Sequence, residues 1–182
     1  MRKIIFAINT TINGNVDHTV GISDDELHNF YTDLLNSVDV VLMGRITYQL
    51  MESFWPVAHK APQSTQSIMR FADKYNSIKK IIFSETLKEV KWQNSQLADR
   101  NLQEIISELK NQDGKNISAG SLSIALQLLK LDLIDEFWIA VHPFVAEKGP
   151  RLFEGIDVIK KLKLVDSKTL SSGVVFHHYL NI

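Results

Sequence analysis

The stretch Val40–Tyr48 reads VVLMGRITY and joins an apolar strand-like run to the start of a helix. The apolar run ends at Gly44, and a helix is predicted from Arg45 onward. In open α/β sheets, ligands bind beyond the carboxyl ends of the strands. The free N–H groups at a helix start favour anions, and Arg45 adds a charge that can bind a phosphate with two hydrogen bonds. This stretch therefore predicts an α/β fold with an anion site at its strand ends.

Two further strands are predicted to end in the same manner. The run Lys79–Phe83 is followed by Ser84–Thr86, and the run Asn116–Ala119 is followed by Gly120-Ser121. Gly120 precedes a predicted helix, as Gly44 does. Each glycine either permits a tight turn or lets a ligand approach the backbone closely. Three such strand ends in one chain favour a cofactor that carries a diphosphate.

The rest of the sequence alternates strands and helices and then ends in a hairpin. Helices are predicted over residues 23–35, 45–54, 65–75, 101–109 and 121–131. Strands are predicted over residues 3–8, 38–43, 79–83, 89–92, 116–119, 136–145, 161–170 and 174–180. A capping box of Ser23 and Glu26 opens the first helix. The pattern predicts a single domain over residues 1–182, a three-layer α/β fold with a mostly parallel central sheet and antiparallel C-terminal strands.

Composition excludes several classes of function. The formal net charge is -1, and Lys and Arg are scattered, so neither nucleic acid nor an anionic membrane is an expected partner. The chain has no cysteine, which excludes disulfides, thiolate zinc sites and cysteine nucleophiles, and no metal site is predicted. No apolar segment reaches the roughly 20 residues of a membrane span. The first apolar run lacks a signal-peptide cleavage site, so a cytoplasmic location is expected.

The common nucleotide and hydrolase motifs are absent, including G-x-G-x-x-G, G-x-x-x-x-G-K-[ST], G-x-S-x-G and H-E-x-x-H. Sequence elements in a fixed order instead resemble the dihydrofolate reductase superfamily. The resemblance is strongest to its stand-alone riboflavin-pathway reductases, which are similar to the RibD C-terminal domain. The elements are Thr11–Val16 (TINGNV), Val40–Tyr48, Ile81–Leu87 (IIFSETL), Ser118–Leu122, and His142-Pro143 with Gly149–Phe153 (GPRLF).

This resemblance implies an oxidoreductase that uses NADPH, with NADH as the alternative, to reduce a small heterocycle. The implied cofactor-binding residues are Asn9, Gly44, Arg45, Thr47, Ser84, Gly120, Ser121 and Leu122. The implied substrate-binding residues are Asn13, Gly14 and His142. For His142 a purely structural role is the alternative to substrate contact.

Three positions depart from the family pattern. Asn13 replaces the aspartate of the opening loop, Glu85 replaces an arginine, and Ala119 replaces the first residue of a glycine pair. A carboxylate beside a 2′-phosphate is repulsive. Glu85 therefore predicts only a weak preference for NADPH over NADH.

His28 bears on the substrate. The resemblance implies a comparison with dihydrofolate reductases, which carry an acidic residue on the first helix that binds the pterin ring. That residue lies about as far before the arginine of the family's MGRxT element as His28 lies before Arg45. A carboxylate accepts two parallel hydrogen bonds, whereas an imidazole offers one nitrogen at a time. Asp25, one turn earlier, is expected to face solvent. His28 is therefore either a proton donor to a different substrate or a residue that fills the cleft side of the helix.

The implied substrate is 5-amino-6-(5-phosphoribosylamino)uracil, an intermediate of riboflavin biosynthesis. Two alternatives stay open, a dihydrofolate reductase and a nucleotide-binding protein that lacks catalysis. A homodimer is also expected. That expectation comes from analogy with the family and from apolar terminal strands that would otherwise leave a sheet edge open.

Overall fold

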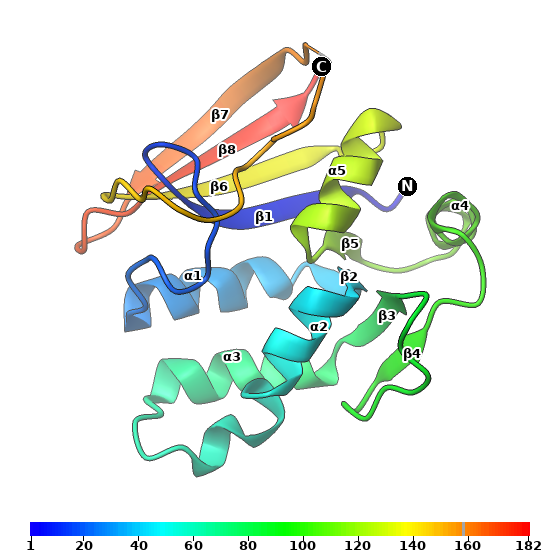
Figure 1. Cartoon of the computed structure of the whole chain (residues 1–182), viewed down its shortest axis with the longest axis horizontal. Coiled ribbons are helices and arrows are strands. Elements are labelled where there is room, and N and C mark those ends of the chain that lie inside the picture. The colour runs from blue at the N-terminus through cyan, green and yellow to red at the C-terminus, as the bar shows by residue number, and fades with distance from the viewer. Residues whose placement is uncertain (158) are drawn as a thin grey trace.

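The computed structural model describes residues 1–157 and 159–182, and within them one eight-stranded sheet carries helices on both faces (Figure 1). The strand order is β4-β3-β2-β5-β1-β6-β8-β7. The strands are β1 (Ile4–Thr11), β2 (Val38–Gly44), β3 (Lys79–Phe83), β4 (Ser95–Leu97), β5 (Asn116–Ala119), β6 (Glu136–His142), β7 (Leu162–Thr169) and β8 (Val175–Asn181). Strands β1 to β6 pair with one another in parallel, and β8 pairs antiparallel with both of its neighbours, β6 and β7. The predicted fold class is confirmed.

The helices form the two outer layers. They are α1 (Asp25–Leu35), α2 (Arg45–Glu52), α3 (Gln66–Ser77), α4 (Leu102–Asn111), α5 (Leu122–Lys130) and the 3₁₀ helix η1 (Trp55–Lys60). Apolar residues of α4 and α5 pack on one face of the sheet. Those of α1, α2 and α3 pack on the other, where α1 and α3 run side by side (Figure 1). Both faces of the central strands are therefore covered.

Strand β2 shows how its sequence serves both layers. Val40 and Leu42 join the cluster beneath α4 and α5, whereas Val41 and Met43 join the cluster beneath α1, α2 and α3. Successive side chains of a strand point to opposite faces, so a strand buried on both sides must be apolar throughout. Full burial of such a side chain stabilises the fold by roughly 1.5–3 kcal/mol. This is why VVLM is continuous rather than alternating.

The structure corrects the predicted start of the first helix. The N-cap of α1 is Asp24, whose carboxylate accepts the Leu27 N–H at 2.8 Å, and not Ser23. Glu26 does not fold back on the cap, because its carboxylate accepts two hydrogen bonds from Ser171 at 2.8 Å. Asp24 and Ser23 are both good capping residues, and the contact between Glu26 and Ser171 joins residues too far apart in the sequence to be predicted from it.

Several strand and helix limits also differ from the prediction, and strand β1 in particular continues to Thr11, beyond its predicted end at residue 8. Residues 89–92 form no strand; Trp92 is buried in the core beneath α3, and β4 follows at Ser95. The second helix ends at Glu52, residues 53–54 form a turn, and the 3₁₀ helix η1 follows with Pro56 near its start. Strand β6 ends at His142 rather than at residue 145, because the next residue is Pro143, which has no N–H to donate to a neighbouring strand.

Candidate functional site

The sheet divides at the carboxyl end of β1. Pairing between β1 and β5 covers only Ile4 to Phe6, while pairing between β1 and β6 continues to Thr11. From Ala7 onward, one edge of β1 therefore has no strand neighbour among the described residues. Exposure rises along this edge, and Asn9 is exposed although it lies inside a central strand. Such a division at the carboxyl ends of parallel strands is where α/β proteins bind ligands.

Two helices start next to this division, one after β2 and one after β5. The Gly44 N–H donates to the Ser121 hydroxyl at 3.0 Å, and that hydroxyl lies 3.4 Å from the hydroxyl of Ser123. The Gly120 N–H donates to the Leu42 carbonyl at 2.8 Å. These contacts hold the N-termini of α2 and α5 side by side, and so bring together the predicted residues Gly44, Gly120 and Ser121.

At each of the two glycines, neighbouring atoms lie close to the position that a side chain would occupy. A Cβ atom at Gly120 would lie 2.4 Å from Cγ1 of Val41 and 3.3 Å from the Leu42 carbonyl oxygen. A Cβ atom at Gly44 would lie 2.6 Å from the Ser123 hydroxyl. Val41 is fully buried, whereas Ser123 is an exposed side chain that can turn away. Of the two helix starts, the one at Gly120 therefore has less room for a larger residue.

Neither of these two helices is capped by a side chain. Their N-cap residues are Gly44 and Ser121, and the Ser121 hydroxyl accepts from Gly44 instead of from its own helix. In the described part of the chain, the other α-helices are capped, by Asp24, Thr65 and Asn101. The first-turn N–H groups of α2 and α5 thus keep their hydrogen-bonding capacity and partial positive charge. Two such termini side by side can bind an anion.

Polar side chains surround these N-termini. Arg45 is exposed, and among the described residues its guanidinium hydrogen-bonds only to Gln49 on the same helix, at 3.3 Å. Thr47 is half-buried in the first turn of α2. Ser84 follows β3, and its hydroxyl accepts the N–H groups of Thr86 and Leu87 in a tight turn, where Glu85 is exposed. Leu122, the first residue of α5, packs against the core instead.

Asn9 and His142 are brought into direct contact. The Asn9 side-chain oxygen lies 3.1 Å from His142 Nε2 and accepts the Tyr31 hydroxyl at 2.8 Å. His142 is 1% exposed, and its Nδ1 accepts the Ile22 N–H at 3.0 Å. Burial lowers the pKa of His142. These contacts favour a structural role for His142, and its contact with substrate stays a prediction. The sequence analysis did not identify Tyr31, because its apolar spacing indicated only a core position.

The opening loop is tied to the segment that follows β6. The Asn13 carboxamide donates to the Ala146 carbonyl at 2.8 Å and accepts the Ala146 N–H at 3.1 Å. The Gly14 carbonyl accepts the Leu152 N–H at 2.7 Å, and Gly14 has a φ of 81°, which favours glycine. Asn13 and Gly14 therefore fix the loop beside the end of β1, and substrate binding by them stays a prediction.

His28 lies in α1 and contacts residues of η1 and α3. Its ring packs against Trp55 and Phe71, with both ring centroids 6.1 Å away. Its Nδ1 is buried and has no partner among the described residues, and burial lowers the pKa of His28. Asp25 is exposed as expected, but its carboxylate accepts hydrogen bonds from the hydroxyls of Thr65 and Ser67. The catalytic role of His28 stays a prediction.

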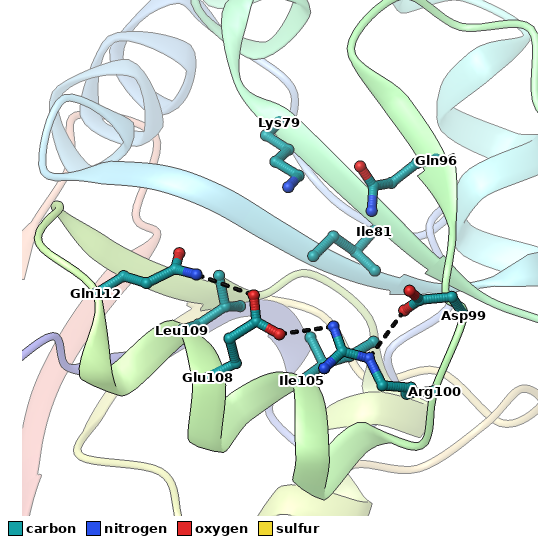
Figure 2. Close-up of a pocket in the computed structure, with 9 residues that line it drawn as sticks. All are labelled: Lys79, Ile81, Gln96, Asp99, Arg100, Ile105, Glu108, Leu109 and Gln112. Atoms are coloured by element: carbon teal, nitrogen blue, oxygen red, sulfur yellow. Dashed lines mark hydrogen bonds and ion pairs between the residues drawn. The ribbon is translucent and has the colours of Figure 1, made fainter.

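Two cavities lie elsewhere. A pocket of about 110 Å³ between β3, β4 and α4 holds a chain of paired polar groups, in which Arg100 contacts Asp99 at 3.3 Å and Glu108 at 2.6 Å (Figure 2). None of the predicted site residues lines it. An apolar groove of about 280 Å³ lies against β6 and β8 and is lined partly by His177 and Tyr179. Within residues 1–157 and 159–182, no group of three His, Asp or Glu side chains could hold a metal ion, and no helix is long and apolar enough to cross a membrane.

Comparison with known proteins identifies the family. The RibD C-terminal domain profile matches residues 2–176. The uncharacterized protein YyaP from Bacillus subtilis (strain 168) is 32% identical over 180 residues, which cover 96% of this chain and 92% of YyaP.

Two solved structures share the fold. A pyrimidine reductase-like protein from Corynebacterium diphtheriae superposes with a TM-score of 0.70 at 15% identity, covering 100% of this chain and 92% of that one. Dihydrofolate reductase from Enterococcus faecalis, complexed with NADP(H), superposes with a TM-score of 0.65 at 10% identity, covering 98% and 96%. The chain therefore belongs to the RibD C-terminal domain family and has a dihydrofolate reductase-like fold.

Proposed function

We propose that this protein is an NAD(P)H-dependent reductase of a small heterocycle. The observation that carries the proposal is the pair of uncapped helix N-termini, α2 and α5, that meet beside Arg45 where the sheet divides. A dinucleotide cofactor carries a diphosphate, which is the anion that two adjacent N-termini and a guanidinium bind well. Membership of the RibD C-terminal domain family supports the same reading.

The residues present fit such a cofactor. First-turn N–H groups of α2 and α5, together with Arg45 and the Thr47 hydroxyl, would hold the phosphates. The turn at Ser84 would lie beside the adenosine ribose, and the exposed edge of β1 at Asn9 would lie beside the nicotinamide. The cofactor supplies the hydride, while the protein aligns the two rings and excludes water.

The proposed substrate is a phosphoribosyl pyrimidine, 5-amino-6-(5-phosphoribosylamino)uracil, rather than dihydrofolate. A pterin needs a free carboxylate on the first helix, and this helix offers His28 at that position. The nearby Asp25 carboxylate already binds the hydroxyls that begin α3. Burial lowers the pKa of His28, so its imidazolium forms at a lower pH than that of an ordinary histidine.

Loss of NADPH absorbance, measured with each substrate in turn, tests this proposal. We expect turnover with the phosphoribosyl pyrimidine and little or none with dihydrofolate. Rapid, methotrexate-sensitive turnover of dihydrofolate would identify a dihydrofolate reductase instead. Binding of NADPH without turnover of either substrate would support the third reading, a nucleotide-binding protein. If His28→Gln leaves pyrimidine reduction unchanged, the reductase stands and the proton-donor role of His28 is rejected.

A homodimer is part of the proposal. Strand β7 is an edge strand of the described sheet, and it exposes Leu164 and Val165 by 51% and 42%. An exposed edge strand with apolar side chains favours pairing with another chain, and two-fold dimers are the commonest homo-oligomers. Light scattering at micromolar concentration should give the mass of two chains, and the mass of one chain would refute the dimer.

A further inference from the structure

Asn9 has an unusual position for a polar side chain. It lies inside the central strand β1, beyond the point where β5 leaves, and its side chain is exposed. Its oxygen meets two groups, the Tyr31 hydroxyl at 2.8 Å and His142 Nε2 at 3.1 Å. A carboxamide oxygen has two lone pairs, so these two partners use its full accepting capacity. Its Nδ2 group has no partner among the described residues.

The protonation of His142 follows from its other contact. Nδ1 lies 3.0 Å from the Ile22 N–H, which can only donate, so Nδ1 must be the unprotonated nitrogen. In the neutral ring Nε2 then carries the proton and donates it to Asn9. The ring is buried, and the Gly21 backbone lies so close to it that an added Cβ atom would be only 3.3 Å from the ring.

These contacts fix which way the Asn9 carboxamide faces. If the group were rotated by half a turn, Nδ2 would face the Nε2 proton of His142, and two donors would meet. With Oδ1 turned to Tyr31 and His142, the Nδ2 group of this exposed side chain is left without a partner among the described residues. Its two N–H bonds are therefore available to a ligand at the carboxyl end of β1, where the sheet divides.

We propose that Asn9 is a fixed hydrogen-bond donor to a carbonyl oxygen of the bound ligand, and that Tyr31 and His142 are the residues that position it. This inference rests on the proposed function, because it places a ligand at the open edge of β1. A carbonyl oxygen at that place has two sources, the carboxamide of the nicotinamide and a ring carbonyl of the pyrimidine. Both carbonyl oxygens are neutral acceptors. A donor of fixed orientation favours such an acceptor and disfavours a ligand that places an N–H group there.

Calorimetric titration with NADPH, followed by steady-state kinetics with the pyrimidine, tests the donor directly. Loss of one hydrogen bond to a neutral group predicts that Asn9→Ala weakens ligand binding roughly 3- to 12-fold. Asn9→Asp should weaken it more, since a carboxylate repels a carbonyl oxygen. If the cofactor is the source, the effect appears in the NADPH dissociation constant. If the substrate is the source, it appears in the KM for the pyrimidine while NADPH affinity stays unchanged.

Variants of Tyr31 and His142 show whether these residues orient the Asn9 carboxamide or only pack against it. Tyr31→Phe and His142→Leu each remove one donor to Asn9 and should weaken the same ligand as Asn9→Ala does. His142→Gln should restore binding, because a glutamine amide can accept from Ile22 and donate to Asn9 together. Tyr75→Phe, which removes a buried hydroxyl from the α3 core, is the matched control and should leave binding unchanged.

The side-chain amide resonance of ¹⁵N-labelled Asn9 gives a readout that does not depend on activity. It should shift when the bound ligand is added, and Tyr31→Phe should reduce that shift. Unchanged affinity for both ligands in Asn9→Ala, with no shift of this resonance, would overturn the inference although the wild type binds NADPH. Failure of the wild type to bind any dinucleotide would overturn the proposed function itself.

Discussion

The helices of this protein begin in two different ways. In α1, α3 and α4, a first-turn N–H donates a hydrogen bond to the side chain of the N-cap residue, which is Asp24, Thr65 and Asn101 respectively. In α2 and α5, which follow the adjacent strands β2 and β5, no side chain does so. A missing cap costs a helix about 1 kcal/mol, so two uncapped helices at one place are a local loss of stability. This loss of stability coincides with the place where first-turn N–H groups are free for a ligand.

The largest effect should come from removing the cation beside the uncapped helices. Arg45→Ala should weaken NADPH binding by roughly 1.5–3 kcal/mol, because a charged hydrogen bond to phosphate is lost. Calorimetry measures this change. Arg100→Ala, at the start of the capped helix α4, is the control and should leave affinity unaltered. Equal affinity of Arg45→Ala and wild type would remove Arg45 from the site.

The close approach of the two uncapped helices can be broken at Gly120. Gly120→Ala places a Cβ atom against the fully buried Val41, and overpacking of this kind costs roughly 1–3 kcal/mol of unfolding free energy. In Gly44→Ala the added atom meets only the exposed Ser123 hydroxyl, so stability should fall less. Urea denaturation of both variants tests the difference. A larger loss in Gly44→Ala would contradict this account of the two helix starts.

Removal of a cap should affect stability alone. Asn101→Ala leaves the Glu104 N–H without its acceptor and should cost about 1 kcal/mol of unfolding free energy. Thr65→Ala should do the same for α3, with a further loss of the contact to Asp25. NADPH affinity should stay at the wild-type value in both. A marked loss of NADPH affinity in Asn101→Ala would contradict the claim that only the uncapped helices bind the cofactor.

The smallest effect concerns the choice between the two nicotinamide cofactors. Glu85 is exposed after β3, and its charge opposes a 2′-phosphate, so the wild type should prefer NADPH only weakly. Glu85→Arg should increase the preference by about 0.5–1 kcal/mol, the scale of an exposed ion pair. The ratio of the NADPH and NADH dissociation constants measures it. A wild type already strongly selective, and unaffected by this change, would show that Glu85 faces away from the ribose.

Much of the fold could be predicted because the strands are short apolar runs with polar limits. Residues 79–83 and 116–119 match β3 and β5 at both ends. Burial of Lys80 could not be predicted, because its amino group is satisfied by contacts that only the fold creates. It donates to the carbonyls of Asn76, Ile78 and Gln93 and lies 4.4 Å from the centre of a Trp92 ring. Burial lowers the pKa of Lys80 to about 8.

The candidate site was only partly predictable for a similar reason. Gly44, Arg45 and Gly120 stand out in the sequence because each follows an apolar strand or opens a helix. The link between Tyr31, Asn9 and His142 joins residues from three separate elements, and no spacing in the sequence indicates it. Helical periodicity assigned Tyr31 to the core and gave no information about the direction of its hydroxyl.

Backbone amide NMR on the wild-type chain, titrated with NADPH, reports separately on the uncapped and the capped helices. We expect large saturable shifts for the first-turn amides of α2 (Arg45–Thr47) and α5 (Leu122–Ile124). The first-turn amides of the capped helices α1, α3 and α4 should shift little. No saturable shift at α2 and α5, or equal shifts at capped and uncapped helices, would contradict the claim that the uncapped pair is the cofactor site.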